Sequence, residues 1–120
     1  MPSQHRVHAA LYQADKVLPD PGDGKTIRVT EDLQICEMVS AAAETRTLAN
    51  PTKSGIRFVL RLMTDGGDIV VTTPNGFNNA GESKATFNDA SDLLSLISVE
   101  TATRGTFRWQ IMTRRIAYAA

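Results

Sequence analysis

Residues 55–74, Gly-Ile-Arg-Phe-Val-Leu-Arg-Leu-Met-Thr-Asp-Gly-Gly-Asp-Ile-Val-Val-Thr-Thr-Pro, decide the fold class of this 120-residue chain. Apolar side chains occupy every second position from Ile56 to Leu62, and a second apolar run begins at Ile69 and ends at Val71. Alternation with a period of two is typical of a β-strand that buries one face. The Asp-Gly pair between the runs favours a two-residue type I′ turn. The stretch therefore predicts a β-hairpin.

The position of the turn sets the predicted register of this hairpin. A turn at Asp65-Gly66 places Leu62 opposite Ile69, so that one face of the hairpin is aliphatic. A turn one residue later keeps the same faces but places Asp65 opposite Asp68, and like charges directly across a strand pair are unfavourable. We therefore predict the first register and keep the second as the alternative.

The rest of the chain adds further short β segments. Residues 92–100 fit either an amphipathic helix or a strand, and we predict a strand because the neighbouring segments are all short strands. Residues 74–83 form a polar loop rich in Asn and Gly. Together these segments predict an all-β fold, a small antiparallel β-sandwich or barrel of six to seven short strands. The other predicted strands are 25–29, 33–39, 84–88 and 106–112.

The N-terminal segment has a different character. Residues 1–24 follow neither a helical nor a strand period, and the Pro-, Asp- and Gly-rich residues 19–24 end the segment. We predict an extended N-terminal arm and loop over 1–24 and a single β-domain over 25–120. The arm carries more apolar side chains than a free tail, which indicates docking on a neighbouring chain. The arm residues predicted to form this interface are Arg6, Val7, His8, Leu11 and Tyr12.

Composition restricts the function classes. The chain has 13 basic and 13 acidic residues, so it lacks the positive field that holds nucleic acid. Its single cysteine, Cys36, is expected to be a buried thiol because it lies in an apolar run. We find neither a signal peptide nor an apolar run of membrane-spanning length, and we therefore expect the protein to stay in the cytoplasm of the cell that makes it and to have no membrane partner.

Motifs for chemistry are weak throughout. His5 and His8 lack further ligands for a metal, and the Asp residues of the glycine-rich loops lack the spacing of a calcium loop. Residues 24–26, Gly-Lys-Thr, resemble the end of a phosphate-binding loop, but the first glycine is missing and a strand follows. We therefore predict no catalytic residue, no metal and no cofactor, and no enzyme activity. A local basic patch, Arg104, Arg108, Arg114 and Arg115, is the one candidate contact for nucleic acid, and we do not expect it to bind.

Several stretches resemble the small structural proteins of tailed phages. They are residues 43–52 with Thr-Leu, the hairpin with its glycine turn and Val-Thr, and residues 85–90 ahead of Trp109. The pattern is similar to capsid decoration, or cement, proteins, and it covers about residues 43–112. The resemblance implies a β-rich, often trimeric protein on the outer capsid surface, where it adds contacts between neighbouring major capsid subunits and performs no chemistry.

We therefore expect a virion protein that stabilises a phage capsid as a homotrimer, whose trimer contacts also cover exposed sheet edges. The alternative is a small β-rich recognition module, which binds a receptor or carbohydrate on a phage tail or virion surface. A recognition module needs a pocket on its loops, usually with exposed aromatic side chains. The aromatic content is only 6%, which favours the first interpretation.

Overall fold

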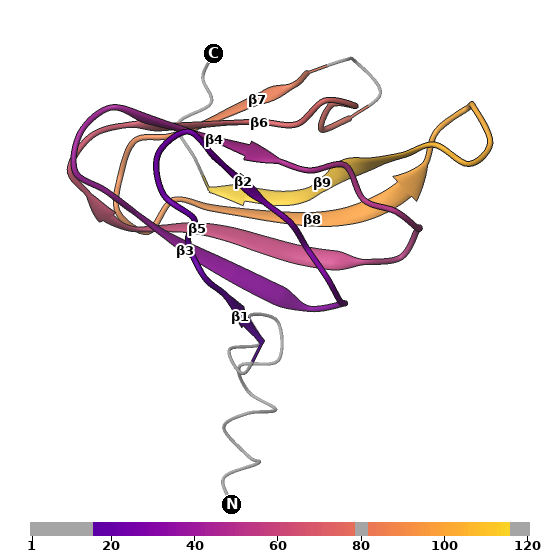
Figure 1. Cartoon of the computed structure of the whole chain (residues 1–120), viewed down its shortest axis with the longest axis horizontal. Coiled ribbons are helices and arrows are strands. Elements are labelled where there is room, and N and C mark those ends of the chain that lie inside the picture. Colours follow the sequence, from indigo (N-terminus) through magenta and orange to yellow (C-terminus); the bar gives the residue numbers. More distant parts are fainter. Residues whose placement is uncertain (1–15, 79–81, 116–120) are drawn as a thin grey trace, which may run out of the picture.

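The computed structural model describes residues 16–78 and 82–115, with the side chains of 113–115 left out. The described chain is an all-β sandwich of two facing mixed sheets, and it is not a closed barrel (Figure 1). The five-stranded sheet has the order β1-β3-β5-β8-β9, and the four-stranded sheet has the order β2-β4-β6-β7. The strands are β1 Val17–Leu18, β2 Lys25–Ile27, β3 Gln34–Ser40, β4 Glu44–Leu48, β5 Arg57–Asp65, β6 Ile69–Thr72, β7 Lys84–Phe87, β8 Leu93–Glu100 and β9 Phe107–Arg115.

The first six strands form three β-arches, units in which two consecutive strands enter the two facing sheets and do not pair with each other. The arches are β1-β2, β3-β4 and β5-β6, and they stack in parallel along both sheets. Ile35 of β3, for example, pairs with Val17 of β1 and with Val59 of β5. The remaining strands β7, β8 and β9 run antiparallel to their neighbours. The predicted antiparallel sandwich is therefore correct as a sandwich and wrong for four of the seven strand pairs among the described residues.

The predicted hairpin is wrong in both registers, because β5 and β6 lie in different sheets. Leu62 pairs with Met38 of β3, whereas Ile69 pairs with Glu44 of β4 and Phe87 of β7. The alternation nevertheless identified the inward residues correctly, since Leu62 and Ile69 both lie in the buried core cluster. An arch and a hairpin bury the same side chains, so the period of the sequence does not distinguish them.

Glycines 66 and 67 are required by close packing between two arches. Neither residue has a positive φ, so the type I′ geometry predicted here is absent. A Cβ atom on Gly66 would lie 2.4 Å from the carbonyl oxygen of Ser40, and one on Gly67 would lie 2.3 Å from the carbonyl carbon of Ala42. The link between β5 and β6 therefore rests on the backbone of the link between β3 and β4, and only glycine fits there.

Ser40 joins these two links through hydrogen bonds. Its hydroxyl donates to the carbonyl oxygen of Gly67 at 2.6 Å. The N–H of Gly66 in turn donates to the carbonyl oxygen of Ser40 at 3.0 Å and lies 3.1 Å from its hydroxyl. These bonds satisfy buried polar groups at the turn and fix the spacing of the stacked arches.

The long loop after β6 completes the open side of the sandwich. The five-stranded sheet has one more strand than the other, and the loop packs against its edge strand β9. Phe77 is buried in the core, its carbonyl oxygen accepts a hydrogen bond from the N–H of Ile111, and the Asn75 side chain donates to the carbonyl oxygen of Phe107. The described part of the loop thus lies against the β9 edge and satisfies two of its backbone groups.

Other predicted elements are confirmed in position. Strands occupy 25–27, 34–40, 84–87, 93–100 and 107–115, so residues 92–100 are a strand and not a helix. Strands β1 and β4 were not predicted. Residues 17–18 of the segment predicted as arm and loop pair with β3, and the first 15 residues of that segment lie outside the described residues.

Gly66→Ala should lower the free energy of unfolding by about 3 kcal/mol, because the added methyl group meets backbone atoms that cannot move aside. Gly105→Ala is the control: it has a positive φ and open space around it, so it should cost only about 1–2 kcal/mol of backbone strain. Chemical denaturation of both variants tests the prediction. A smaller loss of stability in Gly66→Ala than in Gly105→Ala would show that the β3-β4 and β5-β6 links do not touch.

Candidate functional site

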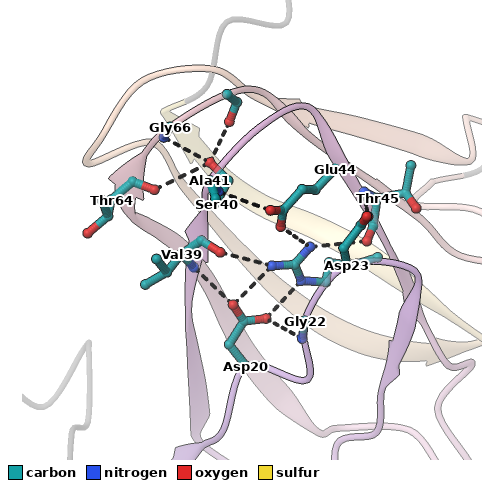
Figure 2. Close-up of polar contacts among 12 residues, drawn as sticks. Asp20, Gly22, Asp23, Val39, Ser40, Ala41, Glu44, Thr45, Thr64 and Gly66 are labelled. Atoms are coloured by element: carbon teal, nitrogen blue, oxygen red, sulfur yellow. Dashed lines mark hydrogen bonds and ion pairs between the residues drawn. The ribbon is translucent and has the colours of Figure 1, made fainter.

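The most developed polar cluster surrounds Arg46, whose side chain is fully buried in β4. Its guanidinium makes two hydrogen bonds to the carboxylate of Asp20, from Nε at 2.8 Å and from Nη2 at 3.0 Å. It also donates from Nη1 to Glu44 at 3.0 Å and from Nη2 to the carbonyl oxygen of Val39 at 3.1 Å. Figure 2 shows Asp20, Glu44 and Val39 converging on this point from three segments. A buried charge is tolerated there because it is paired and fully hydrogen-bonded.

Asp20 links the first arch to the second. Besides binding Arg46, its carboxylate accepts the N–H groups of Val39 at 2.9 Å and Gly22 at 3.2 Å. Burial by itself would raise the pKa of Asp20, but the hydrogen bonds from Arg46, Val39 and Gly22 outweigh it and lower the pKa below 3.8. Both oxygens are occupied by these donors. The cluster therefore acts as a clamp between arches, and its carboxylate is not placed as a general base.

The neighbouring nucleophiles are also engaged in structural contacts. Ser40 donates its hydroxyl proton to a backbone carbonyl, as described above, and no base among the described residues activates it. The Cys36 thiol is buried in the core, and burial, reinforced by the charge of Asp20, raises its pKa to about 12. A thiol with such a pKa is protonated at neutral pH and is a poor nucleophile or metal ligand.

The structure separates the members of the predicted basic patch. Arg104 lies in the turn between β8 and β9, and Arg108 is buried at the start of β9, where it donates to the Gln110 side chain at 2.7 Å. Arg114 and Arg115 lie at the other end of β9, about 20 Å from Arg108 along the strand. The predicted arm interface, Arg6, Val7, His8, Leu11 and Tyr12, lies outside the described residues, as does His5.

The loop aspartates serve local structure. Asp23 accepts the N–H of Thr45 at 2.9 Å, and Asp20 belongs to the Arg46 clamp. Within residues 16–78 and 82–115, no group of three His, Cys, Asp or Glu residues is arranged to hold a metal ion. The same residues contain no helix able to cross a membrane. The segment after Gly24 is strand β2, as the sequence indicated.

One small pocket lies at the end of the sandwich that is opposite the stacked links. It has a volume of about 30 Å³ and is lined by residues of the β2-β3 and β4-β5 connections and by Trp109. The Trp109 indole N–H is already bonded to the carbonyl oxygen of Ala49 at 3.0 Å. A water molecule needs about 10–15 Å³, so the pocket has room for a few waters.

The two outer faces of the sandwich differ strongly in chemistry. The register of the four-stranded sheet places Thr26, Thr47 and Thr72 in one row across three strands, and Thr45 and Thr86 in the next row on either side of Val70. Large hydrophobic side chains with high exposure all lie in the five-stranded sheet, among the described residues. They are Val17, Val39, Met63 and Met112, which are between 41 and 54% exposed.

The outer face of the five-stranded sheet, which we call the apolar face, also carries apolar residues that are less exposed than these four. Ile35 and Val59 pair directly with each other and are only 5 and 6% exposed, yet neither belongs to the core cluster between the sheets. Leu93, Ile97 and Val99 of β8 alternate with core residues and are half-buried on the same side. The apolar face is thus the strongest candidate for contact with another protein segment.

The clamp and the apolar face were both missed from the sequence alone. Nothing in the pattern of residues 44–48 distinguishes a buried arginine from a solvated one. The apolar face did leave a signal, since Phe58, Val59 and Leu60 are consecutive and apolar, as is common in parallel strands that bury both faces. Residues 33–39 show the same near-continuous run.

No protein-family model matches the chain, and comparison with curated proteins finds no relative.

Asp20→Asn should lower the free energy of unfolding by about 3 kcal/mol at neutral pH, because it leaves the buried Arg46 charge without its main partner. Asp32→Asn is a matched control: Asp32 also forms a two-point pair, with Arg57, but both side chains are more than a third exposed. Loss of the Asp32–Arg57 pair should lower the free energy of unfolding by less than about 1 kcal/mol. Equal losses in a denaturant titration would mean that Arg46 is not buried.

The clamp also predicts a dependence on pH. A carboxyl group whose pKa is lower in the folded than in the unfolded chain contributes stability above its unfolded pKa and loses it as the pH falls through the folded value. The Asp20 contribution should therefore be complete at neutral pH, begin to decrease near the reference value of 3.8, and be lost as the pH falls through the lower folded value. The stability difference between wild type and Asp20→Asn should shrink over that range, and a constant difference would contradict the assigned pKa direction.

Proposed function

We propose that this protein is a structural component of a tailed-phage virion, which decorates the capsid and stabilises it by binding between neighbouring major capsid subunits. The observation that carries the proposal is the difference between the two outer faces. A protein that works by contact needs one surface for association and another that remains in water. The apolar face is suited to the first role. The outer face of the four-stranded sheet, which carries the rows of threonines and which we call the threonine-rich face, is suited to the second.

The fold supports such a role through its rigidity. Three stacked arches and the Arg46 clamp fix the two sheets relative to one another, so the apolar face is presented without rearrangement. A pre-organised surface binds with a smaller entropic cost than a flexible one. The resemblance of residues 43–112 to capsid decoration proteins points to the same class of function.

The loop chemistry is less favourable for a receptor- or carbohydrate-binding module. Phe77, the aromatic residue of the polar loop after β6, is buried in the core and is not displayed for binding. Trp109 is buried as well and bonded to the backbone. We therefore favour association with other chains over recognition of a receptor or carbohydrate, and we propose a homo-oligomer of three copies in the virion.

Binding to the assembled shell alone would stabilise it by mass action. The purified protein should co-sediment with shells formed by the major capsid protein of the same genome, raise their melting temperature, and leave unassembled capsid protein unbound. Shells that neither bind the protein nor gain thermal stability would contradict the proposal.

Two substitutions locate the contact surface in the same assay. Met63→Asp, at an exposed position of the apolar face, should weaken attachment about tenfold or more because it places a charge in an apolar contact. Thr26→Asp, exposed on the threonine-rich face, should attach like the wild type. The reverse order would assign the contact to the other sheet.

A further inference from the structure

The pocket at the end of the sandwich lies between two connections, and a buried polar side chain holds the first of them, β2-β3, in place. The Gln34 side chain is only 6% exposed. Its Oε1 accepts the N–H groups of Thr30 at 2.7 Å and Glu31 at 3.2 Å, and its Nε2 donates to the Thr30 hydroxyl at 3.0 Å. Thr30 and Glu31 both line the pocket, so Gln34 fixes this wall from behind.

A second buried polar side chain fixes the opposite wall, which the β4-β5 connection forms. Ser98 is 1% exposed. Its hydroxyl donates to the carbonyl oxygen of Lys53 at 2.7 Å and accepts the N–H of Ile56 at 2.8 Å. Lys53 and Ile56 line the pocket as well. Both walls are therefore set before a ligand arrives, which lowers the entropic cost of binding.

The β2-β3 connection also contains a strained residue. Leu33 has a φ of 66°, in the left-handed region that bulky side chains rarely adopt. Its N–H donates to the carbonyl oxygen of Arg57 at 2.9 Å, and the carboxylate of Asp32 accepts the N–H of Arg57 at 2.8 Å. Strain of this kind persists only where the surrounding structure enforces it, and it is frequent at binding sites. The structure thus holds the pocket wall in a conformation that its sequence disfavours.

The size and lining of the pocket suit one branched aliphatic side chain. The volume of about 30 Å³ corresponds to about two or three waters, which is also the room that a three-carbon branched group needs. Val29, Pro51 and Ile56 contribute apolar atoms to the lining, and the Trp109 indole N–H is already bonded to Ala49. Waters next to these groups find few hydrogen bonds, so an aliphatic group that displaces them gains affinity.

The charges at the pocket favour an acidic neighbour for this side chain. Glu31 and Lys53 are the charged residues of the lining. The Glu31 carboxylate lies 3.7 Å from the Lys16 ammonium group, whereas the Lys53 ammonium group forms no ion pair within the described part of the chain. A carboxylate beside the aliphatic group would therefore complement the charge of Lys53.

We propose that this pocket receives one branched aliphatic side chain of a partner protein, from a peptide segment in which an acidic residue follows the aliphatic one. The contact uses the end of the sandwich and is separate from the apolar face. A protein that joins two neighbouring subunits needs a second contact surface, so the inference extends the proposed function. Its test uses the free protein and short peptides, so failure here and failure of the capsid assay are distinguishable.

Nuclear magnetic resonance titration tests the pocket directly, because Trp109 is the single tryptophan of the chain and its indole N–H gives one peak. The probe is the peptide Gly-Val-Asp-Gly with both ends capped. We expect a saturable shift of the Trp109 peak and of the Thr30 and Lys53 amide peaks. Gly-Ser-Asp-Gly, which lacks the aliphatic group, should bind about tenfold more weakly. Gly-Val-Asn-Gly, which lacks the charge, should bind about two- to fivefold more weakly.

Two variants locate the recognition of the charge. Lys53→Ala changes an exposed side chain and should leave the melting temperature unchanged. It should bind Gly-Val-Asp-Gly and Gly-Val-Asn-Gly equally. Lys25→Ala is the matched control, because Lys25 is exposed but does not line the pocket, and this variant should keep the preference of the wild type.

Three results would overturn the inference. No shift of the Trp109 peak up to the solubility limit of the peptide would exclude the pocket as a binding site. Equal binding of Gly-Val-Asp-Gly and Gly-Ser-Asp-Gly would show that the pocket does not receive the aliphatic group. A preference for the acidic peptide that persists in Lys53→Ala would show that Lys53 does not select the partner.

Discussion

The contact between the links of the second and third arches is the constraint on which the rest of the structure depends. The Gly66-Gly67 backbone lies against residues 40–42, closer than any side chain would permit. This contact sets β3 beside β5 in one sheet and β4 beside β6 in the other, both in parallel. A single local approach therefore determines the register of two sheets and turns an apparent hairpin into an arch.

The clamp around Arg46 extends the stack to the first arch. That arch contributes only two short strands, so its backbone ladders are weak by themselves. Asp20 compensates by binding both Arg46 and the N–H of Val39. At the other end of the stack, Phe77 and its loop cover β9. The outer face of the five-stranded sheet carries the large hydrophobic side chains that are most exposed among the described residues.

The sequence predicted the strands and the inward residues well because alternation reports burial directly. It failed on connectivity for a physical reason: Leu62 and Ile69 are buried in the core whether β5 and β6 pair or not. The glycines were correctly placed between two strands, but the predicted hairpin turn is wrong: their role is steric and depends on residues 40–42, which are more than 20 positions away. The Asp20–Arg46 pair spans 26 residues and leaves no local pattern. The consecutive apolar residues Phe58, Val59 and Leu60 were the available sign of a parallel strand with two covered faces.

Backbone nuclear Overhauser effects test the stacked-arch account most directly, because they report which strands are neighbours. The account predicts contacts between the backbones of Cys36 and Leu60 and of Arg46 and Val71, which are paired in parallel. It predicts none between Leu62 and Ile69. Strong backbone contacts between Leu62 and Ile69, with those of the parallel pairs missing, would show that residues 57–72 form a hairpin and would contradict the account.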